Sequence, residues 1–493
     1  SPIGDYQLTQ AKLGRMAVLI QGGRLVTATS ASNADVLCER GVITRIERSI
    51  DPRGVTLPPG ERLEVVDARD RLVFPGFIDP HVHVYLPFMG TFAKDDWASA
   101  SRAALVGGTT TLIEMICPGK GDEPLAAYET WAGKAAGRSF CDYSFHMGVT
   151  RWDALAEEQL REIVTGRGIR SLKVFLAYKG ALGVDDRELY HALKLARELG
   201  VVVTAHCENE TLIAEKQAEL LASGRTGPEW HEPSRPARVE ALGVEHLAAF
   251  AQATGAEVYV VHTSCRDALD SARAARARGV RMHVETVAPY LTLDSTFAER
   301  GTPAAVDKGE GSFPAFEGAK YVMSPPIRDR RHQEALWKAL ADGTIDCVGT
   351  DHAPFDFKGQ KEMGRGDFTK IPNGIPSVEH RVDLMHTFGV RTGRIDLHRF
   401  VDALSTRPAR IFGLKGKGDL FVGADADIVV YDPEHRSTIS ASTHHMRTDY
   451  SAWEGWEIRG RSETVLLRGE IVVRGGVLTV REGEARGRLT PRQ

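Results

Sequence analysis

Short apolar runs alternate with longer amphipathic stretches through the middle of the chain. The runs are rich in Val, Ile, Leu and Phe, and the stretches between them place apolar residues at helical spacing. The apolar runs fall at 73–81, 109–115, 143–149, 170–176, 201–206, 257–262, 281–285 and 346–351. Helical patterns cover Asp186–Leu199, Val239–Ala253, Arg266–Arg278 and His332–Ala341. Because strands that alternate with helices form parallel sheets, the pattern predicts an α/β fold, a (β/α)8 barrel.

The two ends of the chain have a different pattern. Short β runs broken by Gly, Asn and Pro occur at both ends, within residues 16–70 and 420–480. They predict a small composite β-sandwich domain beside a barrel of residues 71–419. Residues 1–15 are expected to be an expression remnant or a disordered segment. Residues 481–493, rich in Gly, Arg and Glu, are expected to form a tail on the surface or against a neighbouring subunit.

The amino-acid composition limits the classes of molecule that the protein is expected to bind. The 493 residues carry a formal net charge of −4, with acidic and basic residues mixed along the chain, so neither nucleic acid nor an anionic membrane is indicated. A small-molecule substrate is the default. No apolar run approaches the ~20 residues of a membrane span. The six cysteines, none in Cys-x-x-Cys spacing, are typical of reduced thiols in the cytoplasm. Cys207 should face away from its neighbour His206 and is interpreted as a structural thiol.

The candidate chemistry begins with His81 and His83, which follow an apolar run. Alternate side chains of a strand point the same way, so both imidazoles can close on one metal ion from a single strand end. Four other runs each carry or end in one candidate ligand, and these are Lys173, His206, His262 and Asp351. Delivery of such residues from successive strands is typical of the C-terminal face of a barrel.

Lys173 is the unusual member of this set, because an ammonium cannot bind a cation. One interpretation makes Lys173 a buried salt-bridge partner. In the other, burial and nearby metals lower its pKa, and the neutral amine reacts with carbon dioxide to give an anionic carbamate. Two metals ~3.5–4 Å apart need such a bridging anion. Zinc, manganese and cobalt would each accept this ligand set.

Seven segments, in order along the chain, resemble those of the cyclic amidohydrolases, specifically the dihydropyrimidinase and D-hydantoinase branch. They are Gly76-Phe-Ile-Asp-Pro-His81-Val-His83, Lys173-Val-Phe-Leu-Ala-Tyr178-Lys, His206-Cys-Glu-Asn, His262-Thr-Ser, Met323-Ser324-Pro-Pro, Gly349-Thr-Asp351-His-Ala-Pro-Phe and Pro372-Asn373-Gly. The resemblance runs from about Met16 to about Val480 and implies a TIM barrel with a composite β domain. It also implies two divalent metal ions, zinc in the first place, bridged by an N6-carboxylysine.

Position by position, the resemblance implies that His81, His83 and Asp351 bind the first metal, that His206 and His262 bind the second, and that Lys173 binds both. A metal-bridging hydroxide would open dihydropyrimidines or 5-substituted hydantoins to N-carbamoyl amino acids. Asp351 would be the general base and then the proton donor. The Tyr178 hydroxyl, together with the second metal, would stabilise the substrate oxygen. Tyr178 could instead be ordinary barrel packing.

Substrate contacts are also implied by the resemblance. Main-chain groups at Ser324 and Asn373 would hold the ring edge, although both residues could be simple turn formers. An apolar wall for the ring substituent is expected from a set of residues that could also be core, namely Leu86, Phe88, Phe175 and Leu182. A homotetramer or homodimer in the cytoplasm is expected.

Three alternatives stay open at this point. An allantoinase or another cyclic-imide hydrolase would share the metal ligands, whereas Val84-Tyr85 disfavours a dihydroorotase, which carries an arginine there. A non-catalytic scaffold relative would have lost ligands that are all filled here. A mononuclear barrel deaminase would have no use for a carbamate on Lys173.

Overall fold

The computed structural model describes residues 16–302, 313–481 and 483–492. Its larger part is a barrel of eight parallel strands that pair in sequence order. These are β6 (Phe77–Val82), β9 (Thr109–Ile116), β10 (Asp142–Gly148), β11 (Ser171–Phe175), β12 (Val202–His206), β13 (Val258–Val260), β14 (Met282–Val287) and β15 (Cys347–Gly349). The first and last strands meet where the N–H of His83 donates to the carbonyl of His352 at 2.8 Å. The predicted (β/α)8 fold is confirmed.

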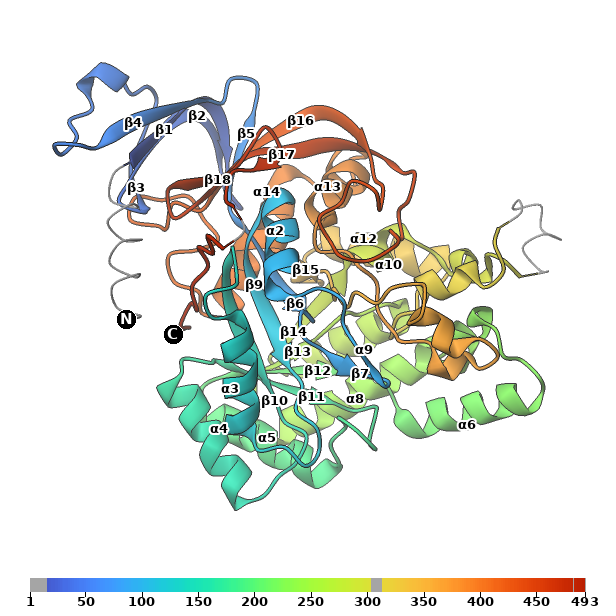
Figure 1. Ribbon diagram of the computed structural model, residues 1–493. Helices are drawn as coiled ribbons and strands as arrows, with labels where there is room; N and C mark the ends of the chain where they lie inside the picture. Colours follow the sequence, from blue (N-terminus) through green and yellow to red (C-terminus); the bar gives the residue numbers. More distant parts are fainter. Residues whose placement is uncertain (1–15, 303–312, 482, 493) are drawn as a thin grey trace.

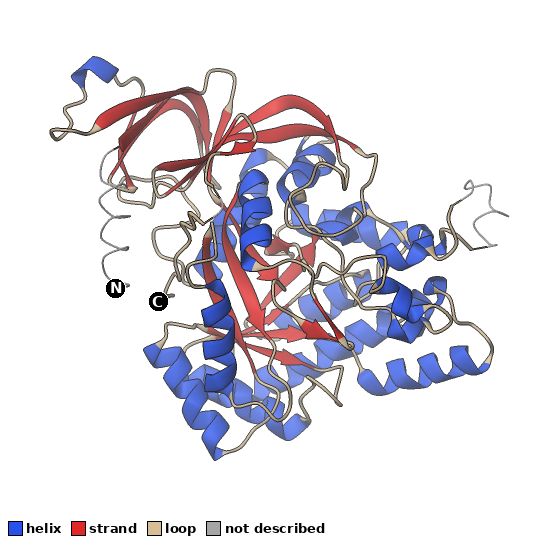
Figure 2. Cartoon of the chain, in the orientation of Figure 1, coloured by secondary structure: helices blue, strands red, loops and turns tan. Residues whose placement is uncertain are grey.

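Helices surround the barrel (Figures 1 and 2). The longer ones are α2 (Trp97–Val106), α3 (Pro124–Ala135), α4 (Ala154–Gly166), α5 (Asp186–Leu199), α6 (Glu210–Ala222), α8 (Ala237–Thr254), α9 (Arg266–Ala277) and α12 (Arg330–Ala341). Short helices are α7 (His231–Ser234), α10 (Ala288–Thr292), α13 (Arg381–Met385), α14 (Leu397–Val401) and α15 (Arg407–Ile411). Asp185 starts α5 with a capping box to Glu188, which satisfies two otherwise free N–H groups.

The run predicted as one strand over 73–81 forms two strands in different sheets. β5 (Leu72–Pro75) pairs with β1 and β16, and only β6 belongs to the barrel. Gly76 separates them at a crowded point, because a Cβ there would lie 2.2 Å from the hydroxyl of Thr110. A continuous apolar pattern therefore hides the crossing from one domain to the other.

A nine-stranded mixed sheet joins the two ends of the chain (Figure 1). Its further strands are β1 (Met16–Val26), β2 (Ala31–Glu39), β3 (Val42–Glu47), β4 (Arg62–Asp67), β16 (Ile428–Thr438), β17 (Glu457–Leu467), β18 (Glu470–Arg474) and β19 (Val477–Leu478). The sheet is tied to the barrel through Lys417. Its ammonium lies 2.6–3.0 Å from three carboxylates, those of Asp142, Asp425 and Asp427.

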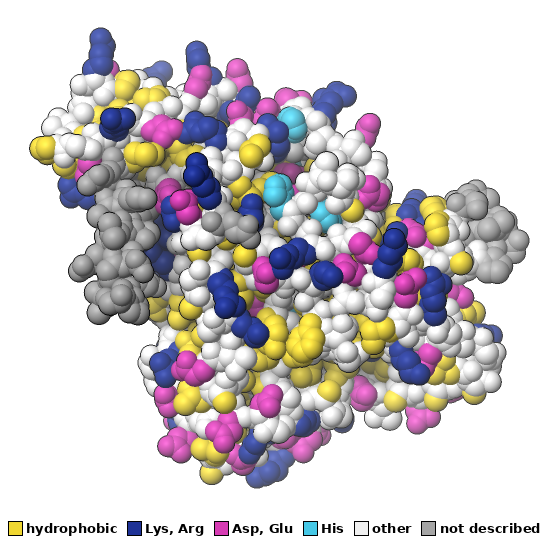
Figure 3. All heavy atoms as spheres, viewed as in Figure 1, with side chains coloured by type: hydrophobic (Ala, Val, Ile, Leu, Met, Phe, Trp, Pro, Cys, Tyr) yellow, Lys and Arg dark blue, Asp and Glu magenta, His cyan; other side chains and the backbone are white. Residues whose placement is uncertain are grey.

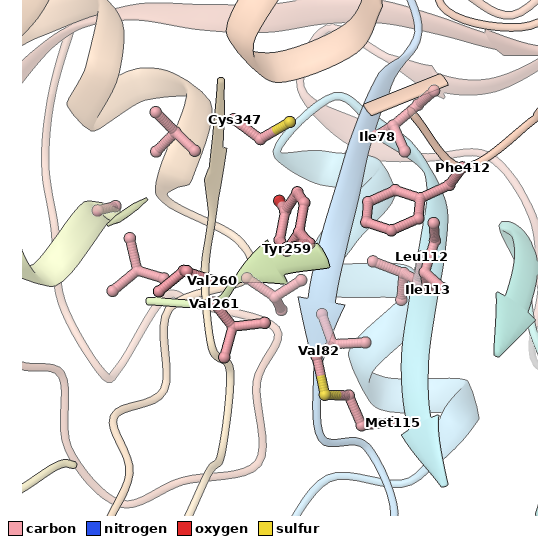
Figure 4. Close-up of a cluster of buried hydrophobic side chains, with 14 of the residues drawn as sticks. Ile78, Val82, Leu112, Ile113, Met115, Tyr259, Val260, Val261, Cys347 and Phe412 are labelled. Carbon is pink, nitrogen blue, oxygen red and sulfur yellow. The ribbon is translucent and has the colours of Figure 1, made fainter. Parts of the chain in front are cut away.

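The barrel strands contribute to a continuous cluster of buried apolar side chains, which Figure 4 shows for Ile78, Val82, Leu112 and Tyr259 among others. On the face shown in Figure 3, acidic and basic side chains are interspersed. Within the described residues, no helix has both the length and the apolar composition of a membrane span. Past residue 482, the chain returns to its own barrel: the N–H of Thr490 donates to the carbonyl of Tyr143 at 2.8 Å, and Arg492 is buried. The proposed remnant at 1–15 lies outside the described residues.

Candidate metal centre

The end of β6 and the segment after β15 bring three candidate ligands together. One carboxylate oxygen of Asp351, Oδ1, lies 3.1 Å from Nε2 of His81 and 3.2 Å from Nε2 of His83. Each of the three residues offers one possible ligand atom, and these three atoms lie within 4.8 Å of one another. Burial would raise the pKa of Asp351, but the neighbouring imidazoles of His81 and His83 hold it well below its usual range. An ionised carboxylate and two imidazoles are a set that suits zinc-type ions.

A second pair of imidazoles faces each other on the neighbouring strands β12 and β13. Nδ1 of His206, at the end of β12, lies 3.0 Å from Nε2 of His262, which follows β13. Burial lowers the pKa of both imidazoles. Both rings are therefore held neutral, which is the form that binds metals.

Lys173 lies on β11 and lines the same cavity as His83, His206 and His262. Its side chain is fully buried, and burial lowers the pKa of its ammonium to about 8. Within the described residues, its Nζ has no hydrogen-bond partner. The salt bridge considered for Lys173 is absent among the same residues. A buried amine with a lowered pKa and no carboxylate partner fits the carbamate interpretation.

The site passes a simple test for metal binding. Buried polar atoms without a hydrogen-bond partner among the described residues include Nε2 of His81, Nδ1 of His83 and Nζ of Lys173. Such atoms are costly unless something binds them. The donor set and these unpartnered atoms together fit divalent ions.

Two buried carboxylates behind the ligands were not predicted from the sequence. Oε1 of Glu285 lies 2.7 Å from Nδ1 of His81, and Oε2 of Glu208 lies 2.8 Å from Nε2 of His206. Each fixes the tautomer of an imidazole, so that its other nitrogen is left to face the centre of the site. A signal existed for both: Glu285 is an acid at the end of an apolar barrel run, and Glu208 is two residues from a ligand.

Backbone strain is concentrated at this site. Three of its non-glycine residues have positive φ angles, which are 61° for Tyr178, 38° for His262 and 50° for Asp351. Such conformations cost ~1–3 kcal/mol each and persist where the surroundings enforce them. At Tyr178, the peptide N–H donates to Oε2 of Glu210 at 2.6 Å and fixes the turn.

Tyr178 and the remaining predicted residues line the cavity of about 50 Å³ next to the candidate ligands. Nδ2 of Asn373 donates to Oγ of Ser324 at 3.0 Å, so these two residues form one polar edge. The four residues predicted to form an apolar wall line the same cavity, namely Leu86, Phe88, Phe175 and Leu182. The Phe88 and Tyr178 rings meet edge to face, with centroids 5.7 Å apart. A wider pocket of about 790 Å³ adjoins, sharing Phe88, Tyr178 and Asn373.

All of the sequence-predicted site residues except His81 line this small cavity, and His81 contacts Asp351 directly beside it. The structure thus brings the whole set together, while their individual roles stay predictions. The sequence did not point to Cys117, His231 or Arg235, which line one or both pockets. These residues carry no motif of their own.

Comparison with known proteins gives one consistent result. The sequence pattern of the Amidohydrolase family matches residues 72–472. A D-hydantoinase of Geobacillus stearothermophilus is 44% identical over 460 residues, which is 93% of both chains. A dihydropyrimidinase of Dictyostelium discoideum is 38% identical over 477 residues, covering 96% of this chain and 90% of that protein.

Solved structures agree with the sequence relatives. The D-hydantoinase (dihydropyrimidinase) of Thermus sp. superposes with a TM-score of 0.90 at 53% identity, over 96% of this chain and 99% of that one. The L-hydantoinase of Arthrobacter aurescens superposes with a TM-score of 0.83 at 28% identity, over 96% of this chain and 99% of that one. Relatives named for opposite enantiomers therefore share this fold.

Proposed function

Because the chain belongs to the amidohydrolase family, in its dihydropyrimidinase and D-hydantoinase branch, and is a cyclic amidohydrolase, we propose that it opens dihydropyrimidines or 5-substituted hydantoins to N-carbamoyl amino acids. The observation that carries this proposal is the convergence of six candidate metal ligands beside Tyr178 at one end of the barrel. Neutral imidazoles, an ionised carboxylate and a buried amine are the groups that a binuclear hydrolytic centre needs.

The proposed ligand assignment follows the two clusters. His81, His83 and Asp351 would hold the first ion, and His206 with His262 would hold the second. Lys173, as a carbamate, would bind both. Two divalent ions, zinc, manganese or cobalt, would activate water at neutral pH and polarise the amide oxygen of the substrate.

The protein's own groups would then move protons and hold the ring. Asp351, kept ionised by its imidazole neighbours, can accept a proton at its carboxylate and return it to the leaving ring nitrogen. The Tyr178 hydroxyl can donate to the substrate oxygen, on which charge grows. Burial raises the pKa of Tyr178, so the phenol keeps the proton that this role needs.

Binding of the ring would use the two sides of the cavity. Ser324 and Asn373 form the polar edge, and Leu86, Phe88, Phe175 and Leu182 form the apolar wall. The adjoining pocket of about 790 Å³ provides room for a ring substituent that extends away from the metal ligands. This division supports a flat cyclic amide with an apolar substituent as the substrate class.

A panel of rings tests the proposal. Metal-loaded protein should hydrolyse dihydrouracil, dihydrothymine, hydantoin or hydantoins with an apolar 5-substituent. It should have much lower kcat/KM for allantoin, whose 5-substituent is polar, and for dihydroorotate. Preference for allantoin, or release of ammonia from an aminopyrimidine, would contradict it. The homotetramer and the cytoplasmic location stay predictions, for light scattering and cell fractionation.

A further inference from the structure

Lys361 is a buried lysine that the proposed mechanism does not use. It begins the short helical turn η5 (Lys361–Gly364), and its side chain is completely buried. Its Nζ donates to two main-chain carbonyls, those of Val322 and Gly374, each at 2.7 Å. Among the described residues, no carboxylate lies within ion-pair distance of it, in contrast to Lys417 with its three aspartates. Burial lowers the pKa of Lys361 well below its usual range, and an amino group buried without a carboxylate partner is expensive, so its position calls for an explanation.

The two carbonyls belong to the two segments that carry the polar edge of the cavity. Val322 lies two residues before Ser324, and Gly374 directly follows Asn373. The segments also meet where the N–H of Gly374 donates to the carbonyl of Val322 at 3.0 Å. No side chain fits at position 374, since a Cβ there would lie 2.4 Å from the carbonyl of Ala353. The amino group of Lys361 therefore bridges the two segments beside their direct hydrogen bond.

The main chain of this edge is free to bind a ligand. Both Ser324 and Asn373 line the cavity of about 50 Å³ next to the candidate metal ligands. Within the described part of the chain, the peptide N–H and carbonyl groups of these two residues make no hydrogen bond. A ring that presents N–H and C=O groups side by side can satisfy them, provided that the two segments keep their spacing.

The neighbouring residue holds the opposite wall. Nε2 of Gln360 donates to Oγ1 of Thr91 and to the carbonyl of Phe92, each at 2.8 Å. Both acceptors lie in the hairpin of β7 (Pro87–Phe88) and β8 (Thr91–Phe92), which carries the apolar wall residue Phe88. The consecutive residues Gln360 and Lys361 thus contact the hairpin of the apolar wall and the segments of the polar edge, respectively.

We infer that Lys361 is a positioning residue that sets the spacing of the Ser324 and Asn373 segments for rings with a urea edge. The inference rests on the proposed function. Dihydrouracil and hydantoin carry a ring N–H beside the carbonyl that follows the scissile amide. Glutarimide and succinimide have a methylene in place of that N–H and keep the scissile imide. A misplaced edge should therefore harm the urea-containing rings more than the simple imides.

The test compares kcat/KM for a matched ring pair, dihydrouracil with glutarimide or hydantoin with succinimide, on samples of known metal content. In Lys361→Met, kcat/KM for the urea-containing ring should fall roughly 10- to 100-fold, mostly through KM, and the simple imide should change much less. Lys361→Gln keeps two N–H donors and should give an intermediate ratio. Metal content should equal that of the wild type.

Lys417→Met is the matched control, because it removes another buried lysine at the junction of barrel and sheet. It should lower Tm and leave the ratio between the two rings unchanged. Parallel losses for both rings in Lys361→Met, or loss of metal, would overturn the inference. If Lys361→Met does not fold, the Lys361→Gln ratio must still fall at least about threefold, and an unchanged ratio overturns the inference. A wild type that opens neither ring would instead refute the proposed function.

Discussion

Glu285 holds His81 from behind: its Oε1 lies 2.7 Å from Nδ1 of that imidazole. The same oxygen accepts the peptide N–H of His262 at 2.9 Å, so one buried carboxylate positions a ligand from each half of the proposed centre. Burial lowers the pKa of His81, but the carboxylates of Glu285 and Asp351 more than offset this and raise it to about 9. Because Nε2 of His81 faces Asp351, a divalent ion bound between them would compete with the proton on that nitrogen.

The first prediction concerns this support. Glu285→Gln keeps the size of the side chain and loses the charge, so metal affinity should fall roughly 10- to 100-fold. Competition with a chelator measures that affinity. Glu240→Gln is the control, because Glu240 is also buried but contacts Ser264 and Arg328 instead of a ligand. Equal affinities in wild type and Glu285→Gln would contradict the supporting role.

Tyr178 should act through its hydroxyl alone. In Tyr178→Phe, kcat and kcat/KM should fall together, because the lost donor serves the transition state. The activation free energy should rise by ~2.7–4 kcal/mol, and KM should stay almost unchanged. Metal content should stay at the wild-type level, since Tyr178 has no assigned ligand role. Full turnover in this variant would show that the ring only packs against Phe88 and Phe175.

The proposed carbamate on Lys173 should be replaceable only by another anionic group. Lys173→Ala should lose most bound metal and nearly all activity, and acetate or propionate should restore part of both by filling the bridge. Lys173→Arg should fail with or without bicarbonate, because a guanidinium does not form a carbamate. Metal analysis and kinetics on the same samples give the answer. A Lys173→Ala enzyme with two metals and normal turnover, without added acid, would exclude the bridge.

Stability should depend on pH through Asp383. Burial raises the pKa of this carboxyl to about 7. The carboxyl accepts a hydrogen bond from the Tyr431 hydroxyl at 2.9 Å. The folded state therefore keeps the proton that the unfolded state releases, and stability falls as pH rises from about 4 to about 7. Asp383→Asn should raise Tm at pH 8 and have little effect at pH 4, with a limit of roughly 4 kcal/mol.

Asp346→Asn is the control of opposite sign. Burial would raise the pKa of Asp346, but His283, whose Nδ1 lies 3.9 Å from Oδ1 of Asp346, and the charge of Arg276 lower it overall. Its replacement should therefore cost stability at both pH 8 and pH 4, and less only as the pH falls below about 4, the ordinary pKa of an aspartate. The same Tm difference at both pH values for Asp383→Asn would contradict the assignment.

The sequence was sufficient for the parts of the site that local pattern encodes. Apolar runs that end in His81, His206 and Asp351 define strand ends, and a barrel brings those ends together. The crossing at Gly76 was missed, because buried strands of two sheets can follow each other without a polar break. Lys361 was also missed: its segment has no periodicity, and its partners at 322 and 374 are chosen by packing, which no local pattern shows.

The most direct measurement is ¹³C NMR of wild-type enzyme reconstituted with metal in ¹³C-bicarbonate, with Lys173→Ala as the reference. The account predicts a carbamate resonance in the wild type that is absent from Lys173→Ala and from protein stripped of metal. Its intensity should correspond to one carbamate for each pair of bound metal ions. A wild-type sample that binds two metals and hydrolyses the ring without that resonance would contradict the central claim.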